Sequence, residues 1–354
     1  MRGKVRYVLT SSNTSQGFHT FLPELLQGVL KIFILKGAPG SGKSTFMRLL
    51  GESFSEQGYE VEFWVSAADP VSPEGVLIPQ LKAAVVNGSL SSPIEPRYPG
   101  VTGDIIYLGD YGDKTFIQSY SQEIIKLCDD QEKHRRQATE VLKNAAAIKD
   151  TIKRQASAYL DLEKLQQVVE QLAEDILEGA PAEKHYFASA VTAEGMINYM
   201  DEISCACKKR YVFQGPAGSG KSTAILGLAA RAQSKGYSLE YYHCGLEADN
   251  IQMIIIRNLE IALVDAGLLE LSVKPWDVVI DMSSCLQDYD AGELVHESSK
   301  SLREYETLIL EAQQELEQAH RCLKDLKKIY ALAMDFEALD NKRLQVRDEI
   351  TRSS

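Results

Sequence analysis

Two nearly identical glycine-rich loops constrain this chain more than any other feature of its sequence. GAPGSGKST occupies residues 37–45 and GPAGSGKST occupies residues 215–223, an offset of 178. The offset holds without a gap from about residue 6 to about residue 88, so that Asn87, at the end of one apolar run, matches Asp265 at the end of another. Agreement of this length in one register indicates a duplicated unit.

The duplication sets the expected domain organisation. At 354 residues the chain is long enough for two domains that each bury a core of their own. We expect two homologous halves, residues 1–180 and 181–354, joined near the short proline-containing stretch 179–184.

Composition limits the classes of protein to consider. The chain is 44% apolar and 25% charged, and no segment approaches the roughly 18 unbroken apolar residues of a membrane span. No apolar run follows the basic N-terminal residues, so we expect no export signal and a soluble, cytoplasmic protein. The six scattered cysteines, Cys205 and Cys207 included, are expected to be reduced thiols. A net charge of −12 makes nucleic acid an unlikely main partner.

The first 110 or so residues of each half alternate short apolar runs with helical patterns. A β-rich run leads through Thr-x-x-Gly to an expected helix, with Thr14 or Thr192 as its N-cap. An apolar strand, the glycine-rich loop, a second helix and further strands follow. This alternation predicts an α/β fold with a mostly parallel sheet in each half.

The last third of each half has a different pattern. Residues 114–178 and 293–354 contain neither glycine nor proline, and in the first of these segments apolar residues recur at steps of three and four. Both segments are expected to be long helices. A helical hairpin, a coiled-coil arm, and helices folded back onto the sheet or onto each other all fit this pattern.

The glycine-rich loops follow the pattern G-x-x-x-x-G-K-[ST], each between an apolar strand and a helix. In this setting glycines let backbone N–H groups turn toward a polyphosphate, the helix N-terminus adds positive potential, the lysine reaches the outer phosphates, and the serine hydroxyl binds Mg²⁺. The residues expected to bind nucleotide are Gly37, Gly40, Ser41, Gly42, Lys43, Ser44 and Thr45 in the first loop and Gly215, Gly218, Ser219, Gly220, Lys221, Ser222 and Thr223 in the second.

Through these two loops the chain resembles the P-loop NTPase superfamily, whose Walker A motif they match. The tandem arrangement with helical tails also resembles poorly characterised bacterial tandem P-loop ATPases. The resemblance covers about the first 110 residues of each half and implies a nucleoside triphosphate, ATP rather than GTP, together with Mg²⁺. It supplies no reaction by itself.

Members of this superfamily usually hold Mg²⁺ through an acidic residue at the end of a second apolar strand. Asp265 has this place in the second half, and the first half has the uncharged Asn87 there. Asp281 is the rival; its counterpart in the first half falls near Asp104 to Asp110, where Asp110 could serve. Besides the loop serines Ser44 and Ser222, the expected metal residues are thus Asp265 and Asp281, and the expected catalytic residues are Lys43, Lys221 and Asp265.

Three functions fit these features. The first is a Mg²⁺-dependent ATPase with two sites in a pseudo-dimer, the second site being more competent. No glutamate follows either strand-end aspartate to activate water, so turnover is expected to be slow or to need another residue, with Arg97 and Arg257 as candidates. The second is a small-molecule or nucleotide kinase whose helical segments act as lids carrying Lys149, Lys153 and Arg154, matched by Lys324, Lys327 and Lys328.

The third is a DNA-associated ATPase with coiled-coil arms. In the first and third readings the helical arms are a candidate surface for a protein partner. Among the dispersed histidines, His243 ends a strand near the second loop, where either a substrate contact or simple packing is possible.

Overall fold

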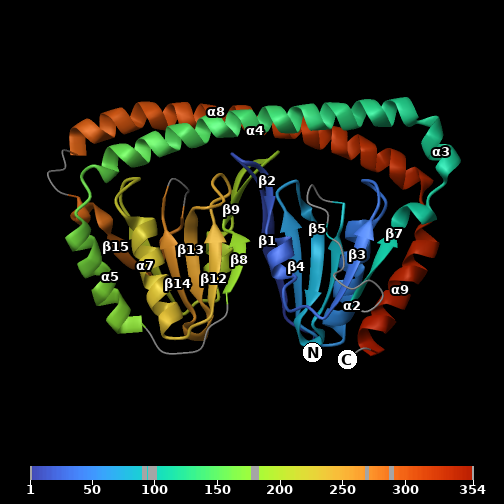
Figure 1. The fold of residues 1–354 in the computed structure, drawn as a ribbon, viewed down its shortest axis with the longest axis horizontal. Coiled ribbons are helices and arrows are strands. Elements are labelled where there is room, and N and C mark those ends of the chain that lie inside the picture. Colours follow the sequence, from blue (N-terminus) through green and yellow to red (C-terminus); the bar gives the residue numbers. More distant parts are fainter. Residues whose placement is uncertain are drawn as a thin grey trace. The chain divides into compact units, whose positions relative to one another are not determined.

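The computed structural model describes residues 2–89, 94, 102–176, 183–267, 271–286 and 291–352, with the backbone alone for residues 156, 171, 173–176 and 291–299. Helices and strands alternate along each half, which confirms the expected α/β class (Figure 1). The expected linker falls largely on residues 179–182, outside the described residues.

The chain forms two compact units, and each unit combines segments that are far apart in the sequence. The first unit comprises residues 1–11, 20–137 and 315–354, and the second comprises residues 12–19 and 138–314. Each unit thus contains a glycine-rich loop from one half of the chain and helical residues from the other half. The homology of the two halves stays a prediction.

The first unit contains a mixed sheet with the strand order β1-β4-β5-β6-β3-β7. Its parallel pairs are β1 with β4, β3 with β6 and β3 with β7, whereas β5 is antiparallel to both β4 and β6. The strands are β1 (Val5–Thr14), β3 (Lys31–Lys36), β4 (Val61–Ser66), β5 (Asp69–Ile78), β6 (Ala83–Asn87) and β7 (Gly103–Tyr107).

The second unit repeats this order as β8-β12-β13-β14-β11-β15, with β13 antiparallel to its two neighbours. The strands are β8 (Glu183–Phe187), β11 (Lys209–Gln214), β12 (Leu239–His243), β13 (Ile251–Ile256), β14 (Ile261–Asp265) and β15 (Val278–Asp281). Each sheet is therefore mostly parallel, as expected, with β5 and β13 running antiparallel to their neighbours.

The N-cap expected at Thr14 and Thr192 is wrong. Both threonines end a strand and form the turn of a hairpin, β1 with β2 (Gly17–Thr20) and β9 (Ser189–Thr192) with β10 (Gly195–Asn198). Each threonine hydroxyl donates to the carbonyl of the following glycine, Gly17 or Gly195, at 2.8 and 2.9 Å. Local side-chain bonding of this kind stabilises a turn as readily as a helix cap.

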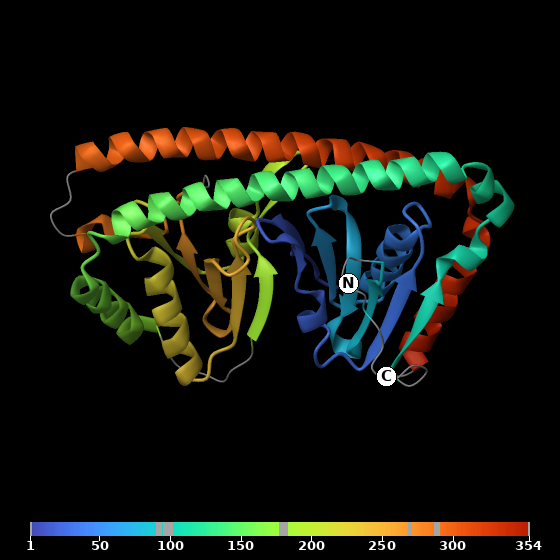
Figure 2. The same ribbon diagram turned by 45° about the horizontal axis from the view of Figure 1, so that its top comes forward.

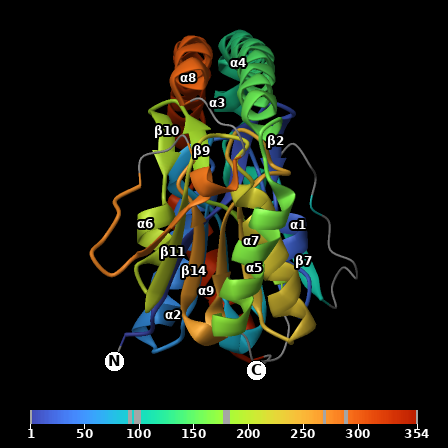
Figure 3. The ribbon, with the colours of Figure 1, turned by 90° about the vertical axis from the view of Figure 1, so that its left-hand side faces the viewer.

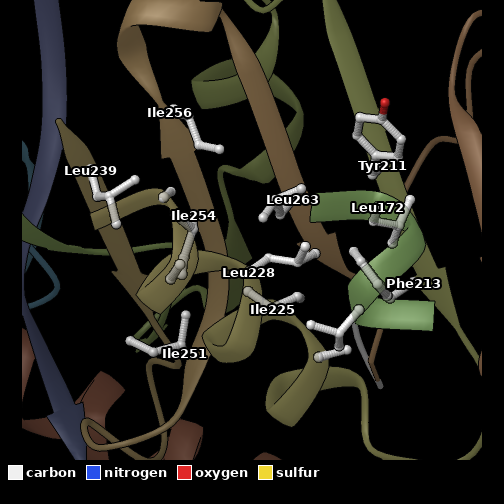
Figure 4. Packing of buried hydrophobic residues seen from close by; sticks show 14 of the residues in the cluster. Leu172, Tyr211, Phe213, Ile225, Leu228, Leu239, Ile251, Ile254, Ile256 and Leu263 are labelled. Carbon is white, nitrogen blue, oxygen red and sulfur yellow. The ribbon is translucent and has the colours of Figure 1, made fainter. Parts of the chain in front are cut away.

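One helix follows each glycine-rich loop, α2 (Lys43–Glu56) in the first unit and α7 (Lys221–Ser234) in the second. In α7, Ile225, Leu228, Ala229 and Ala232 are buried at steps of one, three and four residues, which places one apolar face against the sheet. Figure 4 shows Ile225 and Leu228 directed at Ile254 and Leu263 of the strands. Short helices lie before strands β3 and β11, α1 (Leu22–Leu25) and α6 (Met200–Ser204).

The expected long helices are present in the described residues. They are α3 (Lys114–Ser119), α4 (Ser121–Ser157) and α5 (Leu162–Ile176) in the first half and α8 (Ala291–Ala333) and α9 (Phe336–Arg352) in the second. In both units a part of α4 lies beside a part of α8 (Figure 2). In the first unit Ile124 packs with Leu326 and Ile329, and His134 contacts Glu315 at 2.6 Å.

The terminal helices fold back, and they do so onto the unit that holds the other loop. Helix α5 packs beside α7 in the second unit, where Leu165, Val169 and Leu172 join the core (Figures 1 and 3). Helix α9 packs on α2 in the first unit, where Leu339 and Val346 join the core. The third of the expected arrangements, helices folded back, therefore describes the chain, with the two ends exchanged.

Candidate functional site

The second glycine-rich loop, residues 215–222, connects β11 to α7. Gly220 precedes the helix with φ 86°, a left-handed conformation that favours glycine. Ala224 N donates to Gly220 O as the first helical bond, so the amides of the first turn lack intrahelical acceptors and point toward the loop. The loop thus presents backbone donors and the positive end of a helix.

Three side chains converge in this loop. Lys221 Nζ donates to the carbonyls of Gly215 and Pro216 at 2.9 and 2.8 Å and lies 3.8 Å from Asp265 Oδ1. Ser222 Oγ donates to Asp265 Oδ2 at 3.2 Å. Burial lowers the pKa of Lys221, and the Asp265 carboxylate opposes that shift. The structure therefore brings together the lysine, serine and aspartate expected from the sequence.

The first loop, residues 37–44, has the lysine arrangement but not the carboxylate. Lys43 Nζ donates to Gly37 O and Ala38 O at 2.6 and 2.9 Å. Burial, with a contribution from the positive charge of Lys327, lowers the pKa of Lys43 to about 8. Asn87 pairs in the same register as Asp265, but its Oδ1 accepts from Ser89 N, and in the described part of the chain no hydrogen bond joins it to Ser44.

The residues present fit a phosphate group. Ser41 and Ser219 are 2% and 0% exposed, and their hydroxyls lie inside the loops without a hydrogen-bond partner. A buried hydroxyl without an acceptor is costly, and a phosphate oxygen would supply one. Together with the loop amides and the buried lysine, these donors form the set that a phosphate requires.

The rival metal residue lies elsewhere. Asp281 ends β15, opposite Gln214, and its Oδ1 accepts from Ser283 N at 2.9 Å, a strand-end turn. In the first unit Tyr107, opposite Lys36, has the equivalent place, so Asp110 is not the counterpart of Asp281. Among the described residues, Asp265 alone of the two expected aspartates contacts the loop serine.

Arg257, one of the two arginines expected to stabilise charge, does not lie at the second loop. Arg257 follows β13 and precedes β14, at the opposite end of β14 from Asp265, and it pairs with Glu240 at 2.5 Å. Five strand residues separate those ends by about 15 Å. Arg97 lies outside the described residues.

Each loop contacts a long helix from the other half of the chain, α4 at the second loop and α8 at the first. We call α4 with α5, and α8 with α9, the helical arms. A Cβ on Gly218 would overlap the carbonyl oxygen of Lys153 in α4, and a Cβ on Gly40 would overlap that of Lys327 in α8. Only glycine permits this approach at a positive φ. Gly220 lies likewise against Leu165 of the exchanged helix α5.

The arm adds charged groups that sequence reasoning only partly found. Lys149 and Lys153 of α4 both pair with Glu247, at 2.6 and 3.0 Å, and Lys149 lies 3.2 Å from Cys244 Sγ. Lys327 pairs with Asp69. Glu247 and Asp69 were not anticipated, although the offset of 178 that relates them was visible in the sequence.

A cavity of about 400 Å³ lies against the second loop, within the range of small-molecule sites. It is lined by Lys149, Lys153, Ser157, Leu160, Ser189, Met196, Gly215, Pro216, Ala217, Gly218, Gly220, Lys221, Ser222, Thr223, Cys244, Asn250, Gln252, Asp265, Gly267 and Tyr305. A smaller and mostly apolar pocket of about 190 Å³ lies between α2 and α9 in the first unit, with Gly42, Thr45, Phe336 and Leu339 in its wall.

His243 is a packed residue. It is 8% exposed, its Nε2 lies 2.8 Å from His185 Nδ1, and its other ring nitrogen contacts Ala248 O. Burial, together with the charge of His185, lowers its pKa to about 4, which keeps the ring neutral near pH 7. The six cysteines are free thiols, as expected.

Comparisons of the chain with family models, curated proteins and solved structures found no match. Within the described residues, every helix is too short or too polar to span a membrane.

Proposed function

We propose that the chain binds ATP with Mg²⁺ at both glycine-rich loops and hydrolyses it mainly at the second. The observation that carries this proposal is the cluster of Lys221, Ser222 and Asp265, a cation, a hydroxyl and a carboxylate at one helix N-terminus. The corresponding place in the first unit has Asn87, whose amide adds no charge.

Each group of the second loop has a defined task in this proposal. The loop amides and Lys221 bind phosphate oxygens, and the lysine exchanges its two carbonyl acceptors for them. Ser222 and Asp265 would hold Mg²⁺, and the metal would supply neutralisation of phosphate charge. Ser219 donates its unpaired hydroxyl within the loop.

The kinase reading has one observation in its favour. The cavity extends from the second loop to Ser189, Gln252 and Tyr305, polar side chains beyond those that a triphosphate needs. These side chains offer hydrogen-bond partners for an acceptor molecule. In this alternative a metabolite hydroxyl or phosphate replaces water as the nucleophile.

The test is phosphate release from Mg-ATP by the purified protein, with ADP measured separately. We expect Lys221→Ala to lower phosphate release at least tenfold and Lys43→Ala to lower it less, because a buried charged contact to phosphate is lost. Lys235→Ala, an exposed lysine after the C-terminal end of α7, is the matched control and should retain activity.

Two outcomes would contradict the proposal. Abolition of turnover by Lys43→Ala, with turnover intact in Lys221→Ala, would reverse the assignment of the two loops. ADP formation that requires an added metabolite pool, without phosphate release, would replace hydrolysis with phosphoryl transfer.

A further inference from the structure

Two lysines occupy matching places in the exchanged arms. Lys153 on α4 and Lys327 on α8 are 174 residues apart, and each lies with its backbone against the glycine-rich loop of its own unit, at Gly218 and at Gly40. In sequence, however, each lysine belongs to the half that carries the other loop. Each loop is therefore contacted by a lysine from the opposite half of the chain, and this arrangement occurs in both units.

Each lysine is held by an acidic residue at a matching place in the domain. Lys153 Nζ lies 3.2 and 3.0 Å from the two carboxylate oxygens of Glu247, and Lys327 Nζ contacts Asp69 Oδ2. Glu247 and Asp69 are 178 residues apart, the offset of the two loops themselves. The lysines are related by an offset of 174 and their acidic partners by an offset of 178, yet the same ion pair forms in both units. The ion pair is therefore a feature of both sites and not an isolated surface contact.

These arm lysines are also close to the loop lysines. Lys153 and Lys221 both line the cavity of about 400 Å³. In the first unit the backbone of Lys327 lies against Gly40, three residues before Lys43. A second ammonium group beside each set of loop donors adds the positive charge that a polyphosphate requires.

We propose that Lys153 and Lys327 bind the terminal phosphate of the nucleotide at the second and first loops, each supplied by the half of the chain that does not carry that loop. This proposal rests on the function proposed above. Before nucleotide binds, Glu247 and Asp69 hold the two lysines in place. In the second unit Lys149 remains 2.6 Å from Glu247 and keeps that carboxylate paired when Lys153 turns to phosphate.

Because each lysine comes from the opposite half, the arms can transmit the nucleotide state of one loop to the other half of the chain. A triphosphate draws the arm lysine away from its acidic partner, whereas a diphosphate lacks the terminal group that would do so. Occupancy of one loop by ATP therefore acts directly on a helix that continues from the other half.

The experiment measures affinity at one loop at a time by isothermal titration calorimetry in the full chain with Mg²⁺. Lys43→Ala leaves the second loop to be measured, and Lys221→Ala leaves the first. In the Lys43→Ala background, we expect Lys153→Gln to weaken binding of a non-hydrolysable ATP analogue about tenfold or more and ADP by less than about twofold. In the Lys221→Ala background, Lys153→Gln should leave both affinities unchanged.

Matched controls come from the neighbouring residues of the same helix. Arg154→Gln removes an exposed charge that pairs only with Asp150 among the described residues, and it should leave both affinities unchanged. Lys153→Arg keeps the charge and should restore most of the triphosphate preference. The equivalent variants at the first loop are Lys327→Gln, with the exposed Lys328→Gln as control.

The outcomes separate the two proposals. Equal weakening of triphosphate and diphosphate, no weakening, or weakening at the first loop by Lys153→Gln would each overturn the role of the arm lysines while leaving nucleotide binding standing. Failure of the unsubstituted protein to bind either nucleotide would overturn the proposed function as well.

Discussion

Exchanging the residues at the ends of β14 and β6 tests the asymmetry between the two loops. Asp265 and Asn87 pair in the same register with the strands that lead into the loops, opposite Phe213 and Leu35. Asp265→Asn gives the second loop the side chain of the first, and Asn87→Asp gives the first loop that of the second. The two substitutions change charge with little change in shape.

The distances set the size of the expected effect. The Asp265 carboxylate lies 3.8 Å from Lys221 Nζ, and the two side chains are 13% and 5% exposed. At an effective dielectric constant of about 20, this separation corresponds to about 4 kcal/mol of attraction, an upper bound on the net contribution. Because two carbonyls still accept from Lys221 after the substitution, we expect Asp265→Asn to lower the free energy of unfolding by about 1–3 kcal/mol.

The functional consequence concerns Mg²⁺. In the Lys43→Ala background, Asp265→Asn should raise the Mg²⁺ concentration needed for half-maximal ATP binding about tenfold, since the negative charge that would accept a hydrogen bond from metal-bound water is lost. In the Lys221→Ala background, Asn87→Asp should lower that concentration. Titrations of Mg²⁺ at fixed nucleotide measure both values.

An unchanged Mg²⁺ requirement in both variants would refute the assignment of Asp265. Asp281→Asn distinguishes the two aspartates, because its carboxylate is occupied by Ser283 N and its loss should affect the turn at the end of β15 and not the metal. A larger Mg²⁺ effect from Asp281→Asn than from Asp265→Asn would transfer the metal role to Asp281.

Two further predictions concern stability, both measured by urea unfolding. Leu228→Ala, in the core between α7 and the sheet, should cost about 2–5 kcal/mol, whereas Leu226→Ala, 45% exposed on the same helix, should cost less than about 0.5 kcal/mol; similar losses would contradict the packing in Figure 4. Burial raises the pKa of Glu74 from 4.5 to about 7, so the folded state binds the extra proton and stability falls as pH rises through that window, by up to about 3 kcal/mol. Glu74→Gln, which introduces the amide found at Gln252, should remove this pH dependence, and its persistence in the variant would rule Glu74 out as the cause.

The sequence was sufficient to predict the elements that local pattern determines. The loops, their flanking strands and helices, and the long helices of the arms follow from motif spacing and apolar periodicity. Strand β5 was not predicted because Pro70, Pro73 and Gly75 within it resemble a turn. Its equivalent in the second unit, β13, was not predicted either. The hairpins were mistaken for helix starts because a threonine hydroxyl caps a turn and a helix by the same kind of hydrogen bond.

Sequence patterns could not predict that each helical arm packs on the unit that holds the loop of the other half. Periodicity shows that Leu165 and Leu339 lie on apolar helical faces, but not which surface covers those faces. Two similar halves offer two similar surfaces, so the choice depends on how the chain turns at the ends of α4 and α8. Asp161 shows one such turn: its N–H donates to Cys285 O, and its carboxylate caps α5 through Glu163 N and Lys164 N.

Because the arms are exchanged, a difference between the two loops can arise from residues of either half. In a duplication with self-contained halves, each site would change only through residues of its own half. Here the second loop depends on Lys149 and Lys153 from the first half, and Leu323 has the position in α8 that Lys149 has in α4. The residues that distinguish the second loop, Asp265 in its own strand and Lys149 in the arm of the other half, therefore come from both halves of the chain. A lysine that neutralises Glu247 and a carboxylate that faces Ser222 both favour the binding that we propose for the second loop, an anion together with a metal ion, so the chemical asymmetry of the two loops involves residues of both halves.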